Sequence, residues 1–216
     1  RPFMGSNLVK VLTGIRRSGK SVMLQLIQAE LAAAGKDTKR FIGYNFENMQ
    51  YARLCTAEAL HEEILRRLNP ADGKIYLFFD EIQEVSHWEK CINSLRVEFD
   101  ADIYITGSNA KLLSGELATY LAGRYVEFVI YPFSFAEFRS MYRNIWPNAA
   151  DAECFRRYLI SGGMPYLGSL RYDEEASRQY LQDVYNSVEL KDIVKRSNIR
   201  DVDLLERILA YVTANV

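Results

Sequence analysis

The residues whose chemistry is easiest to recognise lie at positions 14–21, which read Gly-Ile-Arg-Arg-Ser-Gly-Lys-Ser. They match the pattern G-x-x-x-x-G-K-[S/T] at every fixed position. In such a loop the backbone N–H groups surround phosphate oxygens, Lys20 supplies a positive charge near the β- and γ-phosphates, and the Ser21 hydroxyl is a ligand for Mg²⁺. The segment therefore predicts a phosphate-binding loop.

The sequence on either side of the loop supports this interpretation. Residues 8–12 form an apolar strand pattern that ends at the loop, and residues 22–27 begin the apolar face of a helix. The free N–H groups at the start of a helix bind anions. The alternative is a glycine turn without a ligand. Arg16 and Arg17 either touch the nucleotide or, as the notable alternative for these two side chains, face solvent or a partner. The residues expected to bind the nucleotide at the loop are Gly14, Arg16, Arg17, Ser18, Gly19, Lys20, Ser21 and Val22.

A pair of carboxylates follows a second apolar run. Residues 75–79 read Ile-Tyr-Leu-Phe-Phe, which is typical of a strand buried on both faces, and Asp80 and Glu81 come directly after it. Ligands bind at the carboxyl edge of parallel sheets, so we expect this strand to bring both carboxylates to the phosphate site. Asp80 would hold Mg²⁺, through water, and Glu81 would orient or deprotonate the attacking water. The alternative is an ordinary acidic turn.

Small polar residues follow a third strand pattern at residues 102–106. Ser108 and Asn109 come two and three residues after this strand, beyond Gly107. At the same sheet edge, one of the two would sense the γ-phosphate or position the water, and the sequence does not choose between them. The alternative is a strand-to-helix turn in which Ser or Asn caps the helix.

Two further side chains are candidates for control of hydrolysis. Arg124 precedes a strand pattern at residues 125–130, where its guanidinium would reach the γ-phosphate of a neighbouring subunit as an arginine finger. The alternative is a solvated arginine or a structural ion pair. Asn45 ends a strand pattern at residues 40–46, and an amide bonded to Glu81 would turn this base away until a partner binds. The alternative for Asn45 is a hydrogen bond to backbone.

The order of the elements predicts an α/β fold with a parallel sheet, because the strand patterns are separated by helical stretches. Thr56 is expected to cap a helix that reaches residue 68. Ser86 and Glu89 have the spacing of a capping box, and so do Ser134 and Glu137.

After Pro132 the pattern becomes helical. Helices are expected near residues 151–160, 174–194 and 202–214, and a domain boundary near residues 144–148. The sequence therefore predicts a core at residues 1–145 and an all-helical region at residues 146–216. The last helix pattern carries an apolar face that needs a partner, and we expect further protein to follow it.

Composition excludes several classes of protein. The chain has 216 residues, 27 basic and 28 acidic side chains and a net charge of −1, so it lacks the basic footprint typical of nucleic-acid binding. Its three cysteines form no C-x-x-C pattern, so we expect neither a disulfide framework nor a zinc site, but reduced thiols in a cytoplasmic protein. No apolar run reaches the ~18 residues of a membrane span, and no signal peptide is visible.

Together the motifs resemble the AAA+ branch of P-loop ATPases, and more narrowly a poorly characterised prokaryotic family related to archaeal-type ATPases. The resemblance covers nearly the whole chain. It is carried by residues 14–21, 77–83, 106–113 and 121–138, and by a Gly-Gly-x-Pro turn at residues 161–166.

The resemblance implies a fold and a set of roles. The fold is a parallel-sheet P-loop NTPase core with a C-terminal helical lid that begins a winged-helix-like region. Lys20 and Ser21 would bind phosphate and Mg²⁺, and Asp80 and Glu81 would form the Walker B pair. The sensor would be Ser108 or Asn109, and Arg124 a finger. A second-sensor arginine is not identified; the three candidates are Arg156, Arg157 and Arg178.

The function expected from these features is Mg²⁺-dependent binding and hydrolysis of ATP, coupled to a conformational switch, with a homo-oligomer or a protein as partner. The choice of ATP over GTP comes from the resemblance. One alternative is a nucleotide-gated module that binds DNA or protein and hydrolyses weakly. A less favoured one is a small-molecule phosphotransferase, which does not need the water-activating Glu81. The modest basic cluster that would support DNA binding is Lys191, Lys195, Arg196 and Arg200.

Overall fold

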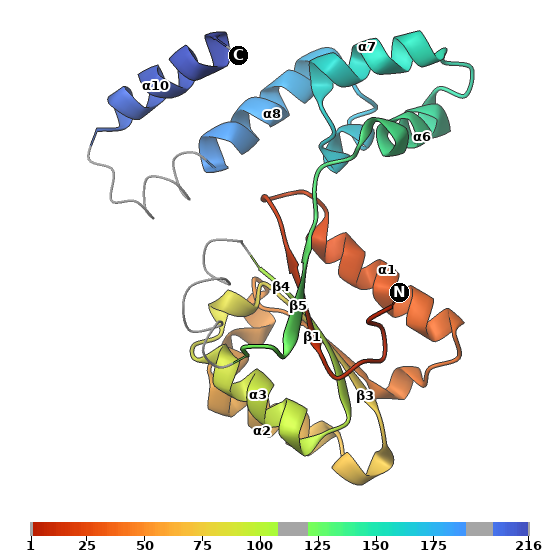
Figure 1. Ribbon diagram of the computed structural model, residues 1–216, viewed down its shortest axis with the longest axis vertical. Helices are drawn as coiled ribbons and strands as arrows, with labels where there is room; N and C mark the ends of the chain where they lie inside the picture. The colour runs from red at the N-terminus through yellow and green to blue at the C-terminus, as the bar shows by residue number, and fades with distance from the viewer. Residues whose placement is uncertain (1, 108–120, 189–200, 216) are drawn as a thin grey trace. The chain divides into compact units, whose positions relative to one another are not determined.

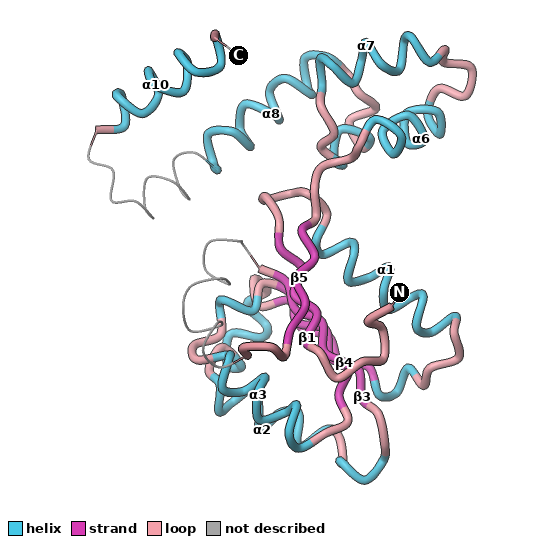
Figure 2. The backbone as a smooth tube through the Cα atoms, in the orientation of Figure 1, coloured by secondary structure: helices cyan, strands magenta, loops and turns pink. Residues whose placement is uncertain are grey.

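Five parallel strands form a single sheet in the computed structural model, with helices on both of its faces (Figures 1 and 2). The structure describes residues 2–107, 121–188 and 201–215. Their contacts divide the chain into two units, Arg1–Pro132 and Phe133–Val216, and each is described by itself. The first unit contains the sheet.

The strand order is β2-β3-β4-β1-β5, and every neighbouring pair is parallel. All carboxyl ends therefore meet at one edge, which is where the sequence placed the phosphate loop and the carboxylates. The strands are β1 (Val9–Thr13), β2 (Phe41–Asn45), β3 (Ile75–Asp80), β4 (Ala101–Thr106) and β5 (Tyr125–Val129). The expectation of a parallel α/β sheet is confirmed.

Burial follows strand position. Every residue of β1, β3 and β4 is buried, whereas the edge strands β2 and β5 are partly exposed. This explains the unbroken apolar run of β3, since a central strand of a sheet covered on both faces has no side in contact with water.

Helices cover the sheet on both faces (Figure 1). Helix α1 (Lys20–Ala33) packs Leu24 and Leu31 into a cluster on one face. Helices α2 (Ala57–Arg67) and α3 (Trp88–Glu98) pack on each other and bury their apolar residues in a larger cluster on the other face. These two clusters fix the positions of β1 and β3. The loop at residues 14–21 directly follows β1, and the carboxylates lie at the end of β3.

Two of the three expected helix caps are present. The Thr56 side chain accepts a hydrogen bond from Ala59 N at the start of α2. Ser134 and Glu137 form a capping box at the start of α6. The expected box at Ser86 and Glu89 is wrong: α3 starts one residue later, with His87 as its N-cap in a left-handed conformation, because the Ser86 hydroxyl donates instead to the carbonyl of Cys55.

The second unit is helical, as expected. Its helices are α6 (Phe135–Ile145), α7 (Asp151–Ser161), α8 (Glu174–Val188) and α10 (Val202–Ala214). By its contacts, α6 belongs to the second unit, because Phe138 and Tyr142 of α6 are buried in the helical cluster with Cys154 of α7. None of the described helices has both the length and the apolar character that a membrane span requires.

Candidate functional site

The loop between β1 and α1 depends on two glycines. Gly14 has φ 141°, and a Cβ at this position would lie 2.2 Å from the carbonyl oxygen of Ile130. Gly19 has φ 101° and is the N-cap of α1. Both conformations favour glycine strongly. The fixed glycines of the motif are thus explained by a close approach of two backbones and by a left-handed turn into the helix.

Lys20 folds back across this loop. Its side chain is buried, and its Nζ donates hydrogen bonds to the carbonyls of Gly14, at 3.2 Å, and Ile15, at 3.0 Å. Burial lowers the pKa of Lys20, while the negative charges of Glu81 and Asp80 act in the opposite direction. The ammonium group is therefore held at the loop with the two carboxylates as its counter-charges.

The loop carries unused capacity to bind an anion. The Ser18 hydroxyl is buried and has no hydrogen-bond partner among the described residues. At the start of α1, within that same part of the chain, no side chain caps the helix and the first turn contains no acidic residue. Ser21 and Val22 are exposed, as are Arg16 and Arg17 of the loop. An anion at this position would meet free N–H groups and a positive charge.

Asp80 is held by both neighbouring strands. Its Oδ1 accepts a hydrogen bond from the Thr106 hydroxyl of β4, and its Oδ2 accepts one from Asn45 Nδ2 of β2 at 3.0 Å. The carboxylate is buried. Two donors from two strands restrict its orientation, as a metal-binding carboxylate requires.

Glu81 turns sharply away from the end of β3. Its backbone is left-handed, with φ 54°, and its N–H donates to the Thr106 hydroxyl at 3.0 Å. Its side-chain Oε2 accepts a hydrogen bond from Gln83 Nε2. Glu81 is half-buried, so its carboxylate retains access to solvent.

The structure corrects one expectation and adds three residues. The Asn45 amide donates to Asp80 and not to Glu81, and its Oδ1 accepts the backbone N–H of Glu47 at 2.9 Å, so the alternative of a hydrogen bond to backbone is present. Glu47, Gln83 and Thr106 were not selected from the sequence. The signal for Thr106 and Glu47 is their place at or just after the ends of strands next to β3. Gln83 is marked in the sequence only as the last residue of the stretch 77–83 that carries the resemblance.

Glu47 adds a third carboxylate to this edge. Glu47 is exposed, but partial desolvation of its carboxylate raises its pKa, and the neighbouring charges of Glu81 and Asp80 raise it further. Arg16 opposes this shift. The edge is therefore strongly negative beside a buried lysine, and a cation would relieve the repulsion.

Arg124 lies at the opposite edge of the sheet. Tyr125, which follows it, pairs with Val9 at the start of β1, whereas the phosphate loop follows the end of β1. At about 3.3 Å per residue, β1 alone separates the two edges by roughly 13 Å. Arg124 is exposed, and its Nη1 donates to Asn93 Oδ1 of α3 at 3.3 Å. The structure therefore does not bring Arg124 to the loop of its own chain.

Several expected residues lie outside the described part of the chain. These are Ser108 and Asn109, the sensor candidates, and the basic cluster Lys191, Lys195, Arg196 and Arg200.

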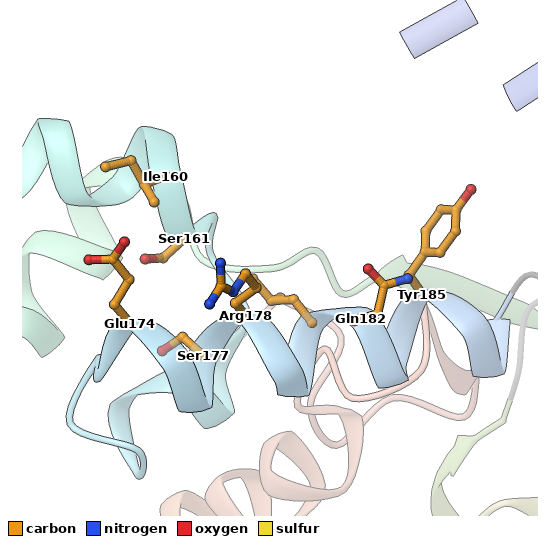
Figure 3. A pocket seen from close by; sticks show the side chains of 8 residues that line it. Ile160, Ser161, Glu174, Ser177, Arg178, Gln182 and Tyr185 are labelled. Carbon is orange, nitrogen blue, oxygen red and sulfur yellow. The ribbon is translucent and has the colours of Figure 1, made fainter. Parts of the chain in front are cut away.

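The second-sensor candidates belong to the helical unit. Arg157 pairs with Glu174 at 3.6 Å, and Arg156 is exposed. Arg178 lines a cavity of about 310 Å³ between the end of α7 and one face of α8. In Figure 3 its side chain rises from α8 toward the end of α7 that carries Ser161. Arg178 thus lies beside a cavity, whereas Arg157 takes part in an ion pair.

The donor set fits a Mg²⁺–nucleotide complex. Among the described residues, no group of three or more His, Cys, Asp or Glu side chains is arranged to hold a metal. Mg²⁺ in nucleotide sites is bound by one or two protein ligands, by phosphate oxygens and by water. The Ser21 hydroxyl and the Asp80 carboxylate supply that number, and the unpaired Ser18 hydroxyl suits a phosphate.

Two family models match successive parts of the chain. Residues 6–139 match a family described as an AAA domain, and residues 152–216 match a domain of unknown function.

The curated relatives are uncharacterised. A protein from Haemophilus influenzae is 37% identical over 214 residues, which cover 99% of this chain and 53% of that protein. One from Methanocaldococcus jannaschii is 33% identical over 221 residues, which cover 97% of this chain and 48% of that protein. The chain thus spans about half the length of these relatives.

Solved structures share the fold. AMPPCP-bound DnaA from Aquifex aeolicus has a TM-score of 0.51 at 16% identity, covering 97% of this chain and 64% of that one. The Holliday junction branch migration motor RuvB from Thermotoga maritima has a TM-score of 0.52 at 15% identity. The match covers 86% of this chain and 63% of the RuvB chain. At these identities the likeness concerns the fold alone.

Proposed function

Because the chain belongs to the AAA domain family, we propose that it binds ATP with Mg²⁺ at residues 14–21 and hydrolyses it, with Glu81 as the base. The observation that carries this proposal is the placement of a buried lysine and two carboxylates at the same edge of the sheet, where the charges of the carboxylates act on the lysine. Lys20 begins α1, directly after the loop that follows β1. Asp80 and Glu81 lie at the end of β3, and β4 lies between β1 and β3. This arrangement supports hydrolysis over simple anion binding.

Each residue has a distinct task. The loop N–H groups and Lys20 would bind the β- and γ-phosphates, and Ser21 and Asp80 would hold the metal ion, which neutralises charge on the phosphates when bound. Glu81 accepts a proton from water as the water oxygen bonds to the γ-phosphorus. The bond from that phosphorus to the bridging oxygen breaks, and ADP leaves with the electron pair. Positioning and charge neutralisation supply most of the acceleration.

A switch coupled to this reaction has a physical route within the first unit. Ile130 N donates to the carbonyl of Thr13 at 2.7 Å, and Ile130 O lies against Gly14. Ile130 is three residues before Phe133, where the helical unit begins. A movement of the loop on loss of the γ-phosphate would therefore reach the segment that leads to the helices.

The position of Arg124 supports action between subunits. It is exposed at the edge of the sheet opposite to its own loop, so an arginine finger requires a neighbouring copy. The adenine base is proposed from the family and from the AMPPCP in the similar DnaA structure.

The test is steady-state ATP hydrolysis and nucleotide affinity, both with Mg²⁺, for the native chain, Lys20→Ala and Glu81→Gln. We expect the native chain to turn over, Lys20→Ala to lose binding, and Glu81→Gln to bind normally but hydrolyse about 10²–10⁴-fold more slowly. Matched controls are Lys36→Ala and Glu58→Gln, which change exposed residues of the same unit.

Two results would contradict the proposal. If the native chain binds ATP tightly but neither it nor its mixtures with partner proteins or DNA hydrolyse it, the nucleotide-gated binding module becomes the better description. If phosphate appears on an added small acceptor molecule and not in water, the chain is a phosphotransferase.

A further inference from the structure

The carboxylate of Glu81 is held by a residue two positions further along the chain. Gln83 lies in a short 3-10 helix, Ile82–Glu84, for which Glu81 is the N-cap. Gln83 Nε2 donates a hydrogen bond to Glu81 Oε2. The two residues are close in sequence, but their contact depends on the left-handed backbone of Glu81. If β3 continued in an extended conformation, the two side chains would leave the same face of the strand in parallel. The turn at Glu81 brings the ends of the two side chains together.

The amide of Gln83 has only one sensible orientation beside a carboxylate. Its NH₂ group must face Glu81, since the amide oxygen would be repelled. Its Oε1 is consequently directed into a buried position and has no hydrogen-bond partner among the described residues. A buried unpaired oxygen is destabilising. Gln83 is therefore poorly explained as a residue that serves stability alone.

Hydrogen bonds restrain both the backbone and the carboxylate of Glu81. Its backbone N–H donates to the Thr106 hydroxyl at 3.0 Å, which sets the direction in which the side chain leaves the strand. The Gln83 amide then restrains the far end. The second possible amide at this edge, that of Asn45, is already bound to Asp80. Among the described residues, the side-chain hydrogen bond that restrains the Glu81 carboxylate is the one from Gln83.

The restraint leaves the reactive part of the carboxylate available. Oε2 is bound to Gln83, so Oε1 is the oxygen that can face a water molecule. The half-buried position of Glu81 and its electrostatic influence on Lys20 both place the carboxylate on the side of the phosphate loop. A neutral amide donor is suited to this role, because unlike lysine or arginine it orients the base without adding a positive charge.

We propose that Gln83 is a positioning residue for hydrolysis: it binds Glu81 Oε2 and thereby aims Oε1 at the attacking water. This inference rests on the proposed function. In the reaction, the proton from water goes to Oε1, the water oxygen bonds to the γ-phosphorus, and ADP leaves with the electrons of the broken bond. Gln83 neither gains nor loses a proton.

The test uses Gln83→Met, which keeps the length of the side chain and removes the amide, alone and combined with Glu81→Gln. We expect Gln83→Met to lower kcat about 10–100-fold, because misplacement of a catalytic group by about 1 Å has effects of that size. KM for ATP and nucleotide affinity should change less than twofold. In the Glu81→Gln background, single-turnover rates should show no further loss from Gln83→Met.

The matched control is Gln179→Met. Gln179 is an exposed glutamine of α8 whose Nε2 also donates to a carboxylate, Asp183 Oδ1, at 3.3 Å. It should leave kcat unchanged. Gln83→Asn keeps the amide on a shorter side chain and should recover part of the lost rate.

The possible results separate the two proposals. A native chain that hydrolyses ATP while Gln83→Met is equally fast overturns the role of Gln83 and leaves the proposed function intact. If Gln83→Met lowers the rate of hydrolysis just as much in the Glu81→Gln background, or lowers it together with nucleotide affinity, Gln83 has a structural role. Either result also overturns the proposed role of Gln83. Absence of hydrolysis in the native chain overturns both.

Discussion

The Thr106 hydroxyl donates a hydrogen bond to the carboxylate of Asp80, so the ends of β4 and β3 are joined by their side chains as well as by their backbones. The same hydroxyl oxygen accepts the N–H of Glu81. One side chain therefore sets the orientation of the expected metal ligand and of the residue that follows it.

Thr106→Val should separate these contacts from packing, since valine has nearly the same shape. It leaves one buried carboxylate oxygen without a donor and one N–H without an acceptor, which we expect to lower the free energy of unfolding by about 1–3 kcal/mol. Urea denaturation measures this change. Thr106→Ser, which keeps the hydroxyl, should lose much less; equal losses in the two variants would assign the effect to packing.

Gly14→Ala should be far more damaging than a typical glycine substitution. The φ of 141° is strained for alanine, at about 1–3 kcal/mol, and the added Cβ would also lie 2.2 Å from Ile130 O. We expect loss of ATP binding and a lower thermal midpoint. The control is Gly35→Ala, where φ is 79° but nothing lies within 4 Å of the Cβ. Similar stabilities for both variants would show that the contact with Ile130 is unimportant.

Glu47→Gln should stabilise the nucleotide-free protein in a pH-dependent way. The pKa of Glu47 is raised in the folded state, so its ionised form is less favourable there than in the unfolded chain. This penalty is absent below the ordinary pKa of 4.5 and is fully present above the raised value.

We therefore expect Glu47→Gln to increase the free energy of unfolding at neutral pH by less than about 1 kcal/mol, because the residue is exposed. The gain should disappear as the pH falls through 4.5. Denaturation curves across this range measure it, with Glu62→Gln, an exposed residue of α2, as control. A gain that is independent of pH would contradict the electrostatic explanation.

Arg124→Ala should abolish hydrolysis between subunits without affecting nucleotide binding. Arginine fingers contribute about 10³–10⁵ in rate, so the loss should be of that order. Mixing Arg124→Ala with Glu81→Gln subunits should restore part of the activity, because some interfaces then combine an intact arginine with an intact base.

Mixing Lys20→Ala with Glu81→Gln subunits is the control for this experiment. Lys20 and Glu81 belong to the same subunit's contribution to each active site. Every active site in the mixture therefore lacks either the lysine or the base, and we expect no recovery of activity. Arg124→Ala chains that turn over normally on their own would leave Arg124 with its structural contact to Asn93.

Much of the candidate site was predictable from the sequence because its determinants are local. The glycines at positions 14 and 19 mark the loop by themselves, since both adopt positive φ. The close approach of Ile130 to Gly14 is added by the tertiary structure. The unbroken apolar run of β3 likewise predicts a central strand and, with it, the delivery of Asp80 and Glu81 to the carboxyl edge.

The capping residues show where local reasoning reaches its limit. The boxes at Ser86 and Ser134 have the same spacing, yet only that of Ser134 is present. The Ser86 hydroxyl donates to the carbonyl of Cys55, a residue 31 positions away, and His87 is the N-cap of α3 in place of Ser86. A capping pattern of a few residues cannot show that a distant carbonyl group will accept the hydrogen bond of the serine hydroxyl.

By itself, the sequence determined the phosphate loop, the acidic pair, the alternation of strands and helices and the helical second part, because each depends on a short stretch of chain. Only the tertiary structure decided which side chains meet. The strand order β2-β3-β4-β1-β5 places β2 and β4 on either side of β3, which assigns Asn45 and Thr106 to Asp80. The same order and register put Arg124 at the opposite edge, because pairing between strands far apart in sequence is set by packing of the whole sheet.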